Sequence, residues 1–313
     1  MGIFTTTLSQ MTYLFAFILI GYLLVKLKIL GRESAGVLSK LENYLFIPAL
    51  VLGTFLHNFS PDTLSTMGGL MLFSLILELC IIPISLLVGK MLSKDGTTQK
   101  VISYDLSFSN FAFMGNAIVL ALFPDYFMEY LIFTLVLWAL IYVWATPALL
   151  IPSKDHSLLA RLKSFCNPMF IALVIGVVLG LLQVQLPTPV MDVIDTAGNC
   201  MSPVAMLLTG ITIASVNVKA TLHKGATWIT CLVRLIVIPL LALLVFALLP
   251  LPKDYLVCAF CTLAMPVGLS PIVIPAAYGK DTSLAASMAL VSHILSVLTL
   301  PLIFMLMQRV LNI

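Results

Sequence analysis

Four ionisable side chains lie inside long apolar segments of this sequence, and they are the residues most able to do chemistry. They are Glu78, Arg234, Asp105 and His293. An ionisable group is costly in hydrocarbon, so one that occurs there usually lies on the path of an ion or a substrate. We therefore treat these four residues as candidates for binding or moving a charged solute.

Glu78 and Arg234 carry opposite charges and lie 156 residues apart. We expect them to form an ion pair, because pairing offsets part of the cost of two buried charges. In the alternative, Arg234 meets a substrate carboxylate and Glu78 carries a proton. For Asp105 we favour a solvated or capping role over a coupling site. For His293 we favour a hydrogen-bonded place between helices over a proton relay.

A second candidate site is a stretch in which two prolines and a glycine interrupt an apolar segment. Pro266, Gly268 and Pro271 lie within residues 254–278. Each proline removes a backbone donor and clashes with the preceding turn, so one continuous helix cannot pass through. Ser270 followed by proline is typical of a helix start. A half-helix that starts inside the membrane directs N–H groups and partial positive charge at one place, which suits an anion.

Membrane-spanning helices are the elements that must position these residues. The chain has 313 residues, of which 61% are hydrophobic and 9% are charged, and its mean hydropathy is +1.14. Such a composition excludes an ordinary soluble fold. Apolar runs of about 20 residues predict an all-α polytopic membrane protein with ten spans, at residues 8–29, 37–57, 65–91, 99–123, 127–151, 167–185, 191–214, 225–249, 254–278 and 284–308.

Basic residues predict the orientation of these spans. Thirteen of the 16 Lys and Arg residues lie in alternate loops, at Lys26, Lys28, Arg32, Lys40, Lys90, Lys94, Lys100, Lys154, Arg161, Lys163, Lys219, Lys224 and Lys280. The opposite loops hold only Lys253 and Arg309. Because basic loops stay in the cytoplasm, both termini should face outward. The same loops account for the net charge of +3, so we expect no nucleic-acid partner.

Helix-bending residues recur at a nearly constant spacing along the chain. The matched pairs, 154 to 156 residues apart, are Gly21 and Gly176, Pro48 and Pro203, Pro83 and Pro239, and Pro147 and Pro301. We therefore predict two five-span repeats, residues 1–152 and residues 166–313. Because five is an odd number, the second repeat should lie inverted in the membrane.

The repeat spacing also predicts a second broken helix in the fourth span. Ser270 corresponds to Asn116, 154 residues earlier. Gly115 weakens a helix and Asn116 is a good N-cap residue, so we expect a half-helix to begin at Asn116. Broken helices at equivalent places of two inverted repeats indicate a binding site at the middle of the membrane.

These motifs resemble those of the auxin efflux carrier family, which includes plant PIN proteins and bacterial organic-acid permeases. The resemblance covers essentially the whole chain, although Ala117 stands where the family usually has a proline. The motifs that carry it are Pro-x-Gly-x-x-Pro at residues 266–271, Ser109-Asn110 followed by Met114-Gly115, Asn167-Pro168 at the start of the sixth span, and Arg234 five residues before Pro239.

The resemblance implies a fold like that of sodium/proton antiporters and bile-acid symporters, in which helices four and nine cross where they break. Spans 1, 2, 6 and 7 would form a scaffold, and spans 3–5 and 8–10 a transport domain. Asn110 would supply a side-chain amide to the substrate. The substrate-binding residues expected at the crossing are Asn110, Gly115, Asn116, Pro266, Gly268, Ser270 and Pro271.

The leading hypothesis is a secondary active transporter of small organic anions, such as malate, malonate or auxin-like acids, that works by alternating access. The alternatives are a channel and an intramembrane enzyme. The sequence contains no His-Glu-x-x-His, Gly-x-Ser-x-Gly or P-loop motif, which argues against the enzyme.

The cysteines and the loops predict few other partners. Cys258 and Cys261 have no further paired ligands nearby, so we expect them to pack in an apolar span, with no metal and no cofactor. The expected partners are the organic anion and the lipid bilayer, which the resemblance to bacterial permeases places at the bacterial cytoplasmic (inner) membrane. A homodimer through the scaffold spans is a further candidate.

Overall fold

The computed structural model describes residues 3–31, 33–151, 168–215 and 225–311. Within these ranges all regular structure is helical, apart from one isolated antiparallel bridge between Ser109 and Val267. Some predictions fall outside the described residues, namely those on Arg32, Lys154, Arg161, Lys163, Lys219 and Lys224, on the motif residue Asn167, and on the repeat boundaries at 152 and 166.

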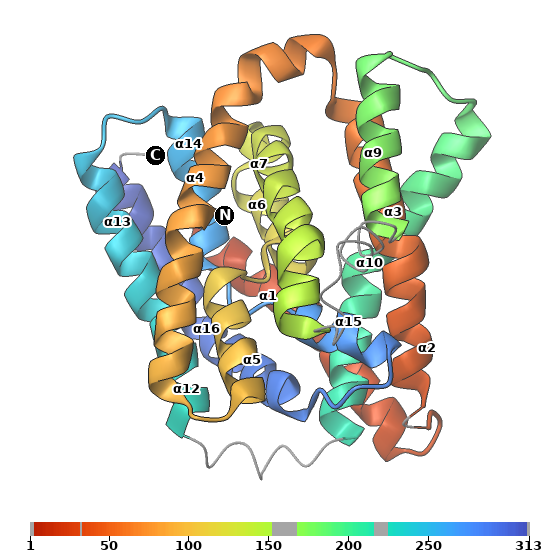
Figure 1. The fold of residues 1–313 in the computed structure, drawn as a ribbon, viewed down its shortest axis with the longest axis vertical. Helices are drawn as coiled ribbons and strands as arrows, with labels where there is room; N and C mark the ends of the chain where they lie inside the picture. The colour runs from red at the N-terminus through yellow and green to blue at the C-terminus, as the bar shows by residue number, and fades with distance from the viewer. Residues whose placement is uncertain (1–2, 32, 152–167, 216–224, 312–313) are drawn as a thin grey trace.

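The first part of the described chain runs from residue 3 to residue 150 (Figure 1). Its elements are α1 (Ile3–Lys26), α2 (Ser34–Leu41), η1 (Glu42–Phe46), α3 (Ile47–Asn58), α4 (Pro61–Leu92), α5 (Gly96–Ser107), η2 (Phe111–Gly115), α6 (Asn116–Leu122), η3 (Pro124–Tyr126), α7 (Phe127–Leu140) and η4 (Ile141–Leu150). The second part comprises α9 (Pro168–Leu181), α10 (Thr188–Ser215), α12 (Gly225–Leu232), η5 (Val233–Val237), α13 (Ile238–Leu248), α14 (Lys253–Ala264), α15 (Ser270–Ala277) and α16 (Ser283–Leu311).

Local signals fix where several of these helices begin. At the start of α4, the Ser60 hydroxyl accepts a hydrogen bond from the Thr63 N–H at 3.0 Å, and Pro61 occupies the first turn. At the start of α5, the Asp95 carboxylate accepts from the Thr98 N–H at 2.7 Å. Both side chains satisfy a backbone donor that the first helical turn leaves without a partner.

In the part of the chain that the structure describes, seven helices are long and apolar enough to cross a membrane, spanning residues 4–26, 34–58, 67–92, 124–150, 188–215, 225–248 and 283–311. These helices and the shorter α9 expose large apolar side chains on their outer faces, among them Leu72 on α4, Val178 on α9 and Leu244 on α13. An apolar surface of this kind is unfavourable in water and suits lipid. The chain is therefore an integral membrane protein with multiple apolar spans.

Three of the ten predicted spans are not long continuous helices in the described residues. Span 99–123 divides into α5 and a helix over residues 111–122, and span 254–278 divides into α14 and α15. Span 167–185 corresponds to α9, which has 14 residues. The all-helical membrane class is confirmed, whereas the ten spans and the inverted repeats remain predictions.

Glycines allow two helix pairs to pack closely. A Cβ added to Gly21 of α1 would meet the backbone of Leu207 in α10. A Cβ added to Gly176 of α9 would lie 2.8 Å from the Cβ of Phe55 in α3, and one added to Gly180 would lie 2.8 Å from the carbonyl oxygen of Phe59. Small residues let membrane helices approach backbone to backbone.

The helices fall into two groups with broken segments between them. Figure 1 shows α3, α9 and α10 together on one side, and α4, α12 and α13 on the other. α1 packs along α10, α4 packs against α5 and α7, and α13 packs against α14 and α16. This arrangement places the ends of α5, α14 and α15 in the interior.

Candidate functional site: a crossing of two broken helices

The first interruption lies between α5 and η2. α5 ends at Ser107, Phe108 is extended, and the next helix begins at Phe111 with Asn110 at its N-cap position. This helix runs from η2 into α6, where Asn116 has helical φ and ψ angles of −56° and −47°. The α-helix α6 begins at Asn116, as predicted, but the π-helical segment η2 precedes it without a gap. The interruption therefore lies before Phe111, and the N-cap role expected for Asn116 is wrong.

Contacts from a neighbouring helix explain why the half-helix begins early. The Tyr130 hydroxyl of α7 donates to the Phe111 carbonyl at 2.7 Å. A Cβ added to Gly115 would meet that same hydroxyl. Gly115 thus makes room for a packed tyrosine and does not break the helix.

The second interruption lies between α14 and α15. α14 ends at Ala264, Met265 is extended, and α15 begins at Ser270 as predicted. The N-cap role expected for Ser270 is wrong, because Leu269 occupies that position and no side chain caps the helix. Pro271 lies in the first turn, where a missing N–H is tolerated.

The two interruptions cross each other in antiparallel directions. The Asn110 N–H donates to the Pro266 carbonyl at 2.8 Å, and Ser109 and Val267 form the isolated bridge. The Ser109 hydroxyl also donates to the Thr262 carbonyl at 2.6 Å. Each broken helix thus supplies hydrogen-bond partners for backbone groups of the other that lack a partner within their own helix. A helix break within a membrane requires such partners.

Gly268 lies where the two backbones approach most closely. An added Cβ would lie 3.0 Å from the Phe108 carbonyl oxygen, 3.1 Å from that of Ser109 and 3.3 Å from the Tyr104 ring. Backbone oxygens fixed by the crossing have little freedom to move away. A residue without a Cβ is therefore needed for this close approach.

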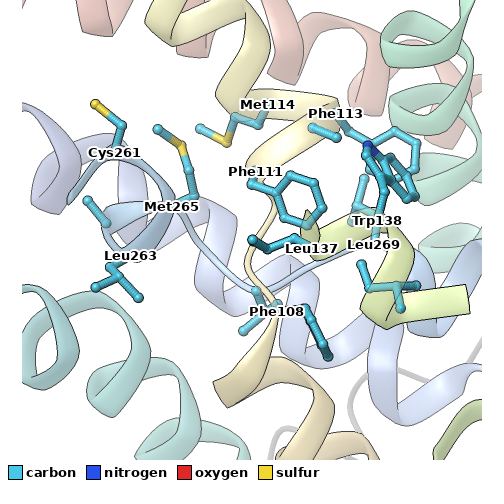
Figure 2. Close-up of a cluster of buried hydrophobic side chains, with 14 of the residues drawn as sticks. Phe108, Phe111, Phe113, Met114, Leu137, Trp138, Cys261, Leu263, Met265 and Leu269 are labelled. Atoms are coloured by element: carbon cyan, nitrogen blue, oxygen red, sulfur yellow. The ribbon is translucent and has the colours of Figure 1, made fainter. Parts of the chain in front are cut away.

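Apolar side chains surround the crossing (Figure 2). Phe111 and Phe113 make edge contacts with Trp138 of α7, with ring centroids 5.4 and 6.2 Å apart. Met265 and Leu137 belong to the same buried cluster. Because these side chains exclude water, charges and dipoles at the crossing interact in a medium of low dielectric constant.

The sequence of the chain matches a known protein family. The sequence matches the membrane transport protein family, which includes the auxin efflux carriers, over residues 6–304. The chain belongs to this family. No curated protein matches the chain. The match includes both interruptions, and it confirms the resemblance to the auxin efflux carrier family. A transporter family is also consistent with a protein that is not an enzyme.

In this membrane transport protein, Arg234 of η5 binds backbone carbonyls of both broken helices. Its Nε donates to the Met265 carbonyl at 3.1 Å, and its two terminal nitrogens donate to Leu106 at 3.0 Å and Thr262 at 3.1 Å. These carbonyls lie at or just beyond the C-terminal ends of α5 and α14, where the helix dipole favours a cation.

The expected ion pair between Glu78 and Arg234 is not formed. No salt bridge joins them among the described residues, and the hydrogen bonds described for Arg234 go to carbonyls. Glu78 and Asp105 still interact electrostatically with Arg234. The prediction failed because the ends of α5 and α14 present backbone acceptors to the guanidinium.

Two buried carboxyl groups lie near this arginine. Glu78 is 2% exposed and Asp105 is 1% exposed. In the part of the chain that the structure describes, both oxygens of Asp105 and the Oε1 atom of Glu78 have no hydrogen-bond partner. The solvated or capping role expected for Asp105 is therefore wrong. α4, α12 and η4 pack against α5, the helix that carries Asp105, so its side chain is buried.

His293 of α16 contacts the crossing directly. Its Nε2 lies 2.8 Å from the Asn110 Nδ2, and its Nδ1 lies 2.7 Å from the Ala289 carbonyl oxygen. The hydrogen-bonded place between helices expected for His293 is confirmed. The Asn110 Oδ1 is buried and has no partner among the described residues.

Three residues that hold the crossing were not identified from the sequence. They are Tyr130, Ser202 and Ser292. Ser292 accepts from the Val267 N–H at 3.0 Å, and Ser202 donates to the Phe113 carbonyl. Ser292 directly precedes the intramembrane His293, and Ser202 directly precedes a helix-bending proline. Their position next to these candidate residues was the one sequence signal that could have identified them.

The helix formed by α2 and η1 also reaches the second broken helix. The Ser39 hydroxyl and the Asn43 Nδ2 both donate to the Val273 carbonyl of α15, the latter at 3.1 Å. Glu42 beside them is buried, and neither of its carboxyl oxygens has a partner within the described ranges.

A separate cavity of about 270 Å³ lies between α3, α7 and α10. Its lining includes Asn199, Leu131 and His57, whose Nε2 lies 2.9 Å from the Asp195 Oδ1. None of the lining residues belongs to the substrate-binding set predicted from the sequence. The cavity is therefore an alternative place for a ligand, and it can be tested against the crossing.

Proposed function

We propose that this chain is a secondary active transporter that moves small organic anions, carboxylates such as malate, malonate or auxin-like acids, by alternating access. The observation that carries the proposal is the crossing of two broken helices, joined where the Asn110 N–H binds the Pro266 carbonyl. Membership of the membrane transport protein family supports the movement of a solute.

The substrate carboxylate binds beside the two helix starts at the crossing. The half-helix over residues 111–122 and α15 begin next to it, and the first N–H groups of each have no partner within their own helix. Two such ends add partial positive charge in apolar surroundings. Of the predicted set, Asn110, Pro266, Gly268, Ser270 and Pro271 lie at these starts.

Gly115 and Asn116 are not assigned to substrate binding in this proposal. Both lie beyond the first turn of their half-helix, so we assign them to its packing. Arg234 is likewise a positioning residue, since its described bonds hold the carbonyl ends of both broken helices. The buried carboxyl groups Glu78 and Asp105 remain candidates for carrying a proton during transport.

The ten-span layout with two inverted five-span repeats is part of the proposal. The close glycine contacts support it, because they exchange partners between the predicted halves. Gly21 of the first repeat packs on α10, and its counterpart Gly176 of the second packs on α3. An inverted pseudo-two-fold relation produces such reciprocal contacts.

Alternating access would arise from movement of one helix group against the other. The scaffold is formed by α1, α2–α3, α9 and α10, and the transport domain by the remaining helices. Among the described residues, Ser39 and Asn43 bind the Val273 carbonyl across the two groups, Ser202 binds that of Phe113, and the Tyr142 hydroxyl donates to the Asn43 Oδ1 at 3.4 Å. Most of these bonds go to a backbone acceptor, which a neighbouring polar group can replace when the domains shift.

Basic loops and family resemblance support the remaining features of the proposal. Both termini face outward from a bacterial cytoplasmic membrane, and the scaffold spans provide a homodimer contact. The exposed apolar side chains Val174 and Val178 on α9 are available for such a contact or for lipid. Impermeant labelling of cysteines introduced near the helix ends tests the orientation, and crosslinking along α9 tests the dimer.

Substrate binding and uptake in proteoliposomes test the proposed site. We expect Asn110→Ala to weaken malate or indole-3-acetate binding by about 10- to 100-fold, the effect of losing a hydrogen bond to a charged group. Asn199→Ala, in the separate cavity, is the matched control and should bind like the parent. The reverse pattern would move the site to that cavity. Saturable uptake that exchanges with internal substrate indicates a carrier, whereas conductance far above carrier turnover indicates a channel.

A further inference from the structure

The hydrogen bonds of His293 determine which of its nitrogens carries a proton. The Ala289 carbonyl can only accept, so the Nδ1 atom 2.7 Å away must be the donor. In a neutral ring the other nitrogen, Nε2, is then an acceptor. The Asn110 Nδ2, 2.8 Å from Nε2, donates to it.

This tautomer fixes the orientation of the Asn110 amide. Its NH₂ group faces the histidine, so its Oδ1 faces the other way, buried and without a partner among the described residues. A carbonyl oxygen is an acceptor, as is a carboxylate. With His293 neutral, the side chain expected to bind the anion therefore presents a group that repels it.

A proton on His293 reverses this arrangement. Both ring nitrogens become donors, and Nε2–H then requires an acceptor at the Asn110 amide. Rotation of the amide by half a turn brings Oδ1 to the ring and directs Nδ2, with its N–H bonds, away from it. The same residue then offers donors to a carboxylate.

We propose that His293 is a proton-binding site of this transporter, and that a proton taken from solvent onto its Nε2 turns Asn110 from an acceptor into a donor for the substrate carboxylate. The inference rests on the proposed function and specifies its coupling, with one proton bound together with one carboxylate charge. His293 is a positioning residue in this scheme, because it acts on the anion through Asn110.

Within the described residues, no ion pair involves the His293 ring. Charged or titratable side chains on the described elements that pack against α16 are Tyr13, Tyr22 and Lys26 on α1, Asp192, Asp195 and Cys200 on α10, Lys100, Tyr104 and Asp105 on α5, Cys231 on α12, and Arg234 on η5. The hydrogen bonds described for the His293 ring go to Asn110 and Ala289 and to none of these. A buried imidazolium needs compensation, and the substrate carboxylate provides it.

The pH dependence of binding tests the coupling. Binding of malate and indole-3-acetate to the purified protein is measured from about pH 8 to about pH 6, where carboxylic acids stay mostly ionised. We expect the affinity for the carboxylate to rise as the pH falls, by up to about tenfold for each pH unit. Tenfold is the limit when one proton is taken up with the ligand. In His293→Gln the slope should vanish, because a glutamine amide can face Asn110 with either its oxygen or its nitrogen.

A second histidine provides the matched control. His57→Gln removes a half-exposed histidine that bonds Asp195 beside the separate cavity, and it should keep the pH slope of the parent. A slope that persists in His293→Gln overturns the inference but leaves the proposed function standing. Absence of binding by both acids at every pH in the parent overturns both proposals.

A measurement without ligand tests the tautomer itself. In protein labelled with ¹⁵N at histidine, the His293 signals are assigned by comparison with His293→Gln. We expect Nδ1 to carry the proton at neutral pH, which is the less common tautomer of a histidine side chain in water. A ring protonated on Nε2 alone would overturn the inference, since Asn110 would then already face it with Oδ1. Asn110→Ala should free the ring to change tautomer without unfolding the protein, which its melting temperature monitors.

Discussion

The two interruptions at the crossing perform the same structural task with different residues. The second one contains Pro266 and Pro271, which remove backbone donors from the chain itself. The first contains no proline, and its backbone is held by neighbouring side chains, such as Tyr130 on the Phe111 carbonyl. The second break is therefore built into its own segment, whereas the first depends on the helices packed around it.

This difference predicts how each half responds to change. A break fixed by proline persists when a neighbour is altered, because the missing donors cannot be restored. A break held by tertiary hydrogen bonds weakens when one of those bonds is lost, because the exposed backbone groups then lack partners. Arg234 is the exception, since it bonds carbonyls on both sides.

The largest effect should come from Arg234→Gln, which affects both interruptions at once. The glutamine amide cannot reach all three carbonyls, and buried acceptors left unpaired should lower the free energy of unfolding by about 3–5 kcal/mol. Arg309→Gln, at the end of α16, is the control and should have little effect. Adding Glu78→Gln should give no rescue; recovery of stability in the double variant would restore the ion-pair hypothesis.

A smaller effect is expected from Tyr130→Phe, which removes the bond to the Phe111 carbonyl. The expected loss is about 0.5–1.5 kcal/mol, with faster amide exchange in η2 but not in α15. Tyr13→Phe, which alters a tyrosine that is 51% exposed, serves as the control. Equal loosening of both half-helices would show that the first break is no more dependent on its neighbours than the second.

The smallest effect should come from Pro271→Ala. The new N–H falls in the first turn of α15, where helical N–H groups have no intrahelical partner, so the break should persist. Loss of the proline constraint should lower stability by about 0.4–1 kcal/mol. Pro61→Ala, at the start of α4, is the matched control. If amide exchange shows a helix running from α14 into α15, Pro271 alone sets the break.

The sequence predicted the second interruption well and misplaced the first. Prolines act on their own segment, so residues 266–271 could be interpreted without knowing their neighbours. Gly115 and Asn116 look like a break by local propensity, yet Tyr130 packs on Gly115 and the helix continues through both. Tertiary packing overrides weak helix propensities, and no local pattern records which tyrosine lies opposite.

The ionisable residues show a similar limit. All four lie within apolar segments and all four are buried, because hydrocarbon tolerates few charges, although the sequence favours a solvated or capping role for Asp105. Their partners could not be deduced, since Arg234 bonds carbonyls that become available only where two helices end. A pairing rule based on opposite charge considers side chains alone, and it misses the backbone as a partner.

The bonds of Arg234 have a mechanical consequence. One guanidinium holds Leu106 on α5 together with Thr262 and Met265 at the end of α14, so these helix ends cannot separate without breaking a bond to the same group. The crossing should therefore travel as a rigid unit during transport. Exchange between inward-facing and outward-facing forms would then be a single cooperative process, with one rate observed at both interruptions.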